Sequence, residues 1–217
     1  MWHAVSFALM DSVNVLLIGL IVAIGVLLPR GGKYGRIMAL LVGGDWMGVF
    51  LLSLATMFVF DGVQETVRRV LDSPVFGIIL IAVGVLGAIM TFRGGDNSGL
   101  LERLLPPVQT PTAKTFFAGF FLGVIQSLTS VPFFGGIAVL SVGGFSVAVR
   151  YLGMFFYASL ALSLPALTAV GVGFVRHYPE SPAGRGFEWM RNHGEAVNNW
   201  AGYIVSAVLI GLGIVHL

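Results

Sequence analysis

Apolar runs of roughly bilayer length recur along the whole chain and constrain its fold more than any other feature. A helix that crosses a membrane needs about 20 mainly apolar residues. We predict a spanning helix in each of six stretches: about 4–29, 37–60, 74–92, 115–141, 146–175 and 199–217. Only short loops separate them, so the sequence predicts an all-α integral membrane protein with a single membrane domain over residues 1–217.

The composition supports this prediction and removes several function classes. Hydrophobic residues make up 57% of the chain and charged residues only 10%, against about 25% charged in soluble domains. The net charge of +2 is small and the basic residues are scattered, which argues against a nucleic-acid partner. The chain has no cysteine, so it cannot supply thiolate metal sites or redox disulfides.

Catalytic residue patterns are not apparent either. The sequence shows no convergent set of histidine, serine and carboxylate residues and no metal-ligand spacing, and the four histidines lie at the ends or in one loop. We therefore predict that the protein is not an enzyme and holds no cofactor. Whether it binds a metal is left open.

The distribution of Lys and Arg predicts the orientation of the spans. Nine of the twelve fall in the first, third and fifth loops, and three fall on the opposite side. Because cytoplasmic loops carry the excess of positive charge, we expect both termini outside the cell membrane. Segments 61–72 and 100–105 carry apolar residues at helical spacing among charged ones, which predicts either helices on the membrane surface or short packed loop helices.

The two halves of the chain carry a faint internal repeat. At an offset near 115 residues, Asp11-Ser12-Val13-Asn14 aligns with Gln126-Ser127-Leu128-Thr129. Half-repeats of about 1–95 and 113–217 would each hold three helices, and an odd number places the halves in opposite orientations. This is the inverted-repeat plan of many secondary transporters. The alternative is a chance alignment of two polar clusters.

Asp11 is the most informative polar position. A carboxylate inside a spanning helix costs about 2.5–3.5 kcal/mol on insertion scales, so it normally faces a partner or a watery path. Ser12 is adjacent and Asn14 lies about one turn further on, and such oxygens suit a cation or an ammonium group. Alternatively, Asp11 caps a helix break or hydrogen-bonds a neighbouring helix.

Asp45 follows Gly43 and Gly44 within the second predicted span. If Asp45 lies opposite Asp11, the two carboxylates repel in a low-dielectric cavity, and a proton or cation can be exchanged there. If it lies near an interface, it merely faces water.

The fourth predicted span carries Gln126, Ser127, Thr129, Ser130 and then Pro132. Proline removes a backbone donor and clashes with the preceding turn, so we expect this helix to bend or open and line a cavity. The alternative is a static proline kink. Pro165 predicts a similar kink in the fifth span.

The opening segment SFALMDSVNVLLIGLIVAIGVLL, with its Asp-Ser-x-Asn cluster, and the polar, proline-broken fourth span together resemble the LysE-like superfamily of small six-helix exporters. That group includes exporters of amino acids and divalent cations, lipid-addressing proteins of the GAP and Sap type, and carriers related to DsbD. The resemblance implies export or translocation through inverted three-helix halves. Its matching cluster positions here are Asp11, Asn14, Gln126 and Thr129.

Two departures from the superfamily are informative. The amino-acid exporters typically carry a Gly-Pro-Asn element where this chain reads Ser12-Val13-Asn14. The carriers of reducing equivalents need two membrane cysteines, which this chain lacks. Thiol redox transport is therefore set aside.

These features lead to one principal functional prediction and two alternatives. We predict a proton- or ion-coupled exporter of a cation or cationic metabolite that works by alternating access. Its ionisable groups would be Asp11 and Asp45, and the segment 126–132 would shape the path. The alternatives are translocation of a lipid or glycolipid and a non-transporting membrane scaffold. Membrane lipid and the small cationic or lipid substrate are the expected partners, and a homo-oligomer is possible.

Overall fold

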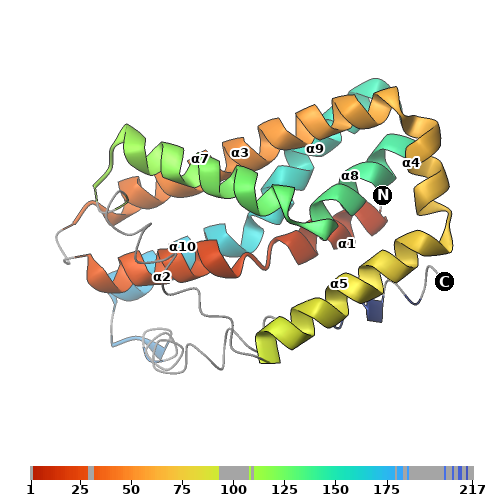
Figure 1. The fold of residues 1–217 in the computed structure, drawn as a ribbon. Helices are drawn as coiled ribbons and strands as arrows, with labels where there is room; N and C mark the ends of the chain where they lie inside the picture. Colours follow the sequence, from red (N-terminus) through yellow and green to blue (C-terminus); the bar gives the residue numbers. More distant parts are fainter. Residues whose placement is uncertain are drawn as a thin grey trace.

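A computed structural model describes residues 2–28, 32–92, 108, 110–178 and a few isolated positions after 178 (180–182, 185, 203, 207, 210–211 and 214). Regular structure within these residues is entirely helical, as expected (Figure 1). The helices are α1 Trp2–Asp11, α2 Val15–Leu27, α3 Tyr34–Gly62, α4 Gln64–Leu71, α5 Pro74–Phe92, α7 Ala113–Leu128, α8 Val131–Val142, α9 Val147–Ala161 and α10 Ser163–His177.

The lengths of these helices bear on the predicted membrane spans. By length and composition, one described helix, α3, can cross a membrane unaided. Up to five spans result if each bent pair of helices counts as one, with bends of 44° for α1–α2, 68° for α4–α5, 75° for α7–α8 and 41° for α9–α10. The sixth predicted span, 199–217, falls almost entirely outside the described residues.

Three of the predicted spans are broken helices, and a bend was predicted from proline in two of them. In the span 4–29 the break lies at residues 12–14, where the Asn14 side chain caps α2 by accepting a hydrogen bond of 2.9 Å from the Leu17 amide. The short polar side chain competes with helical backbone bonds and so ends one helix and starts the next.

The other two breaks lie just before a proline. Between α7 and α8 the chain breaks at Thr129 and Ser130, and Pro132 occupies the first turn of α8. Between α9 and α10 the break is at Leu162, three residues before Pro165. Because proline is tolerated in the first turn of a helix, where its missing N–H leaves no intrahelical bond unmade, each new helix begins one or two residues before its proline.

The broken pairs α1–α2 and α7–α8 run in opposite directions. In Figure 1 the chain passes from right to left along α1 and α2, and from left to right along α7 and α8. Helix α1 packs against α8 and α9, and α2 packs against α10. The breaks of the two pairs consequently lie in the interior of the bundle.

Helices α3 and α7 form the most extensive helix pair of the described chain. Gly44 and Gly48 of α3 face the backbone of α7 around Phe116 and Phe120, while Gly119 and Gly123 of α7 face the backbone of α3 around Leu41 and Asp45. A Cβ atom at any of these four glycines would collide with a backbone carbonyl of the facing helix. Small residues thus bring the two backbones into direct contact.

Helix α4 corresponds to part of the predicted surface segment 61–72. Asp61 belongs instead to the last turn of α3, and none of the eight residues of α4 is buried. Its apolar and charged side chains are segregated at helical spacing, as in helices that lie at a membrane surface. The other predicted surface segment, 100–105, lies outside the described residues.

Candidate functional site

A cavity of about 370 Å³ lies where the breaks of α1–α2 and α7–α8 meet the middle of α3. Its walls include both helix breaks, the residues around Asp45 in α3, and Leu162 at the break between α9 and α10. A pocket of this size, lined mainly by apolar side chains with a few convergent polar groups, has the features of a small-ligand site.

The structure brings most of the predicted site residues to this one cavity. Seven of the eight line it; they are Asp11, Asn14, Asp45, Gln126, Ser127, Thr129 and Pro132. The eighth, Ser12, is buried and does not line the cavity, because its hydroxyl donates a hydrogen bond of 2.6 Å to the Leu9 carbonyl.

Asp11 ends α1 and is held by residues of the second half of the chain. The Ser130 hydroxyl donates a hydrogen bond of 2.5 Å to Oδ1 of Asp11. Ser130 also caps α8, since its Oγ accepts a hydrogen bond of 3.1 Å from the Phe133 amide. The Tyr157 hydroxyl, which donates to the Pro132 carbonyl at 3.1 Å, lies beside the same carboxylate. Asp11 therefore hydrogen-bonds a neighbouring helix and also lines the cavity.

Asp45 differs from Asp11 because no described residue hydrogen-bonds its carboxylate. Its side chain is 0% exposed, so it does not face bulk water at an interface. Neither carboxylate oxygen has a hydrogen-bond partner among the described residues, and the same is true of Nε2 of Gln126. Burial of an unpaired carboxylate is costly. These two side chains thus have unused hydrogen-bonding capacity within the cavity.

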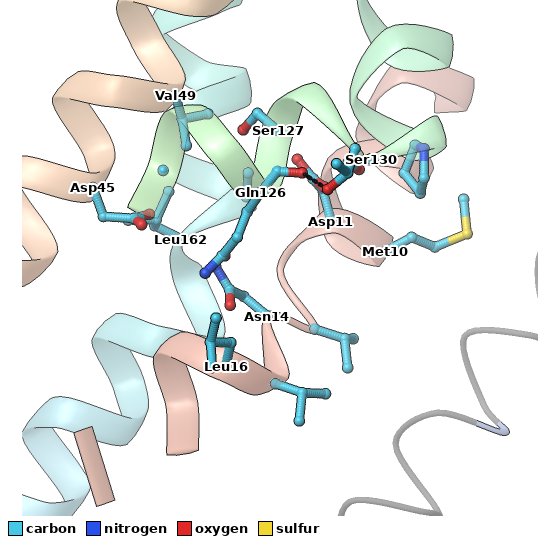
Figure 2. A pocket seen from close by; sticks show the side chains of 16 residues that line it. Met10, Asp11, Asn14, Leu16, Asp45, Val49, Gln126, Ser127, Ser130 and Leu162 are labelled. Atoms are coloured by element: carbon cyan, nitrogen blue, oxygen red, sulfur yellow. Dashed lines mark hydrogen bonds between the residues drawn. The ribbon is translucent and has the colours of Figure 1, made fainter. Parts of the chain in front are cut away.

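Figure 2 shows how these side chains lie around the cavity. In this view Asp45 and Asp11 enter from opposite sides, and the Gln126 side chain extends between them toward Asn14. Carboxylate, amide and hydroxyl oxygens thus converge from α1, α3 and α7. This oxygen set suits a proton, a hard cation or an ammonium group.

The helix breaks also bring backbone carbonyl and amide groups to the cavity. At a break, the last carbonyls of one helix and the first amides of the next lose their intrahelical partners. The side chains of Asn14 and Ser130 each satisfy one amide, at the starts of α2 and α8. The C-terminal ends of α1 and α7 carry partial negative charge, which favours a cation near them.

A multidentate metal centre is not apparent in the part of the chain that the structure describes. There, no group of three or more His, Cys, Asp or Glu side chains is placed to hold a metal ion. The cavity offers two carboxylates, so any cation would also depend on amide, hydroxyl or carbonyl oxygens.

Two residues that contact or lie beside Asp11 were not among the predicted site residues, although Ser130 falls within the predicted segment 126–132. Ser130 stands between Thr129 and Pro132 in the same polar segment, and its position before a proline is a recognisable signal for a helix N-cap. Tyr157 lies in α9 among apolar residues. Nothing in its local sequence distinguishes it, because its role depends on tertiary packing alone.

No protein-family model, curated protein or solved structure matches this chain. The resemblance to the LysE-like superfamily therefore stays a prediction.

Proposed function

We propose that this chain is a small secondary transporter of the cell membrane that exports a cation or a small cationic metabolite, coupled to a proton or another ion. The cavity between the two helix breaks is its binding site. One observation carries the proposal: Asp45 is fully buried, lacks a hydrogen-bond partner among the described residues, and lines the same cavity as Asp11.

The carboxylates supply the chemistry for coupling. Two acidic groups that line one buried cavity share their protons, and their charges disfavour simultaneous ionisation. A bound cation and a bound proton therefore compete to neutralise the pair, and this competition is the basis of exchange. The Ser130 hydroxyl holds Asp11 in place, while Asp45 remains available to the ligand.

The arrangement of the helices supports transport by alternating access. Broken helices whose ends meet inside the bundle are a common construction of secondary-transporter binding sites. The opposite directions of α1–α2 and α7–α8 (Figure 1) suit two inverted halves. We further propose that the chain crosses the membrane six times, with three spans in each half and both termini outside.

A transport experiment tests the proposal directly. The full chain is reconstituted into liposomes that contain a pH-sensitive dye, and gradients of Na⁺, Mg²⁺, Mn²⁺, lysine or arginine are imposed in turn. We expect at least one cation to drive proton movement in the native protein and Asp45→Asn to abolish it. Asp72→Asn is the matched control, because Asp72 is a largely exposed carboxylate at the end of α4.

Other outcomes would favour the alternatives. Lipid translocation would be favoured if no cation moves protons while a fluorescent phospholipid crosses the bilayer faster than in empty liposomes. The scaffold interpretation would be favoured if neither assay responds. Transport that Asp45→Asn leaves at the native rate would overturn the assigned role of the cavity.

A further inference from the structure

A second cavity, of about 320 Å³, lies at the α4 end of the bundle between α4, the end of α8 and the start of α9. It shares no lining residue with the cavity described above. Its polar wall is formed by Gln64, Glu65 and Arg68 of α4, Ser141 of α8 and Arg150 of α9.

Arg150 is buried beside this cavity with its hydrogen-bonding capacity only partly used. Its Nη1 forms an ion pair with Asp61 and also donates to the Ser141 carbonyl at 3.4 Å. The residue is 9% exposed, and its Nε has no hydrogen-bond partner among the described residues. Asp61 pairs with Nη1, so the Nε–H group of Arg150 is still able to donate a hydrogen bond to a ligand.

Ser141 presents a second donor of the same kind. Its hydroxyl is 3% exposed and also lacks a hydrogen-bond partner within the described chain. The Gln64 amide adds no further donor, because its two N–H groups already donate to Asp61 and to the Ser141 carbonyl, each at 3.3 Å. Buried donors normally find acceptors, so this cavity suits a ligand rich in acceptor oxygens.

The charges around the cavity indicate the charge of that ligand. Two guanidinium groups, Arg68 and Arg150, and one carboxylate, Glu65, line it. The Glu65 carboxylate is held by Arg69 at 3.4 Å, and Arg68 has only a long 3.9 Å ion pair with the exposed Asp72. Arg68 can therefore turn toward a ligand at little cost, because exposed pairs of this kind are weak.

We propose that this cavity binds a phosphate ester, supplied by a phospholipid headgroup or by a free phosphate ester in solution. Guanidinium groups pair well with phosphate oxygens. Arg150 is paired with Asp61 and Glu65 is paired with Arg69, so Arg68 supplies the one available positive charge. A phosphodiester, which carries one negative charge, matches it. Helix α4, with its segregated apolar and charged side chains, would lie at the depth of lipid headgroups.

Binding to the full-length protein in detergent tests this assignment. The probes are short-chain phosphatidylglycerol, free glycerophosphoglycerol and, as a lipid without phosphate, short-chain diacylglycerol. The variant Arg68→Gln removes one guanidinium from the lining, and Ser141→Ala removes one buried hydroxyl. Lys114→Gln is the matched control, since Lys114 is an exposed basic residue at the start of α7 that does not line the cavity.

We expect phosphatidylglycerol to raise the apparent unfolding midpoint of the native protein and of Lys114→Gln. Its affinity should fall about tenfold in Arg68→Gln and in Ser141→Ala, as expected for the loss of one charge-assisted hydrogen bond. If glycerophosphoglycerol behaves in the same way, the phosphate ester alone suffices. If only phosphatidylglycerol does, the ligand is a lipid headgroup, and if only the free ester does, it is a soluble compound.

Three results would overturn the assignment: no response to either phosphate ester, an equal response to diacylglycerol, or equal weakening by Lys114→Gln. None of these variants touches Asp11 or Asp45. The outcome is therefore independent of the proposed transport site.

Discussion

The Ser130 hydroxyl donates a 2.5 Å hydrogen bond to the Asp11 carboxylate and thereby joins two helix breaks that lie 119 residues apart in the sequence. The same Ser130 oxygen caps α8 through the Phe133 amide. One small side chain thus starts a helix of the second half and fixes an acidic group of the first half. Each break depends on the other.

Removal of this hydroxyl should destabilise the protein. Ser130→Ala deletes the α8 cap and one donor to Asp11, and together these losses should cost about 2 kcal/mol. Thr129→Ala is the control, because the Thr129 hydroxyl donates only to the Ile125 and Gln126 carbonyls of its own helix. Thermal unfolding in detergent would contradict the prediction if the two variants lowered the midpoint equally.

Asp45→Asn should stabilise the fold while it removes transport. The carboxylate is buried without a hydrogen-bond partner among the described residues, so a neutral amide of the same shape should gain about 1 kcal/mol. Asp11→Asn should act in the opposite direction, since it weakens the bond with Ser130. Unfolding midpoints of the two variants, measured in the same detergent, would check both signs.

The glycines between α3 and α7 should tolerate substitution by alanine far less well than neighbouring glycines do. At Gly44 a Cβ would meet the backbone of Phe116 and Phe120, and at Gly43 it would meet nothing within 4 Å. We expect Gly44→Ala to cost about 1–3 kcal/mol through overpacking. Gly43→Ala should be neutral or slightly stabilising, because alanine is the better helix former. Equal unfolding midpoints for these adjacent variants would show that the two backbones are not in contact.

The ion pair between Arg150 and Asp61 should contribute far more than the pair on the surface of α4. Loss of one partner of a buried pair leaves an uncompensated charge and costs about 3–5 kcal/mol. Since the Asp61 side chain is 22% exposed, we expect Asp61→Asn to cost somewhat less, about 2–3 kcal/mol. Asp72→Asn, which breaks the exposed pair with Arg68, should cost at most about 1 kcal/mol. Denaturant titrations of the two variants provide the comparison.

The sequence predicted the helical class and the residues of the cavity better than it predicted the helices themselves. Polar groups inside apolar runs are rare, so Asp11, Asp45 and Gln126 could be recognised without tertiary information. Their apolar surroundings, however, gave no sign that the first predicted span breaks after Asp11. A break at this point is one of the alternatives that the sequence leaves open for Asp11, as a residue that caps a helix.

Prolines indicated which other spans are interrupted, but not where. Pro132 and Pro165 each lie in the first turn of a new helix, so the interruption falls two or three residues upstream. The contacts of Tyr157 with Pro132 and of Arg150 with Asp61 join residues 25 and 89 positions apart. Pairings of this kind depend on how the helices pack, and no local pattern in the sequence carries that information.

The direct backbone contact between α3 and α7 has a mechanical consequence. Helices that meet through glycine, with few side chains interleaved, cannot separate without loss of the whole interface, so α3 and α7 should move as one rigid body. Asp45 and Gln126 travel with that body, whereas Asp11 is tethered to α8 through Ser130. A rotation of the α3–α7 body relative to α1 and α8 would then change the distance between the two carboxylates. That change would alter their affinity for a ligand bound between them.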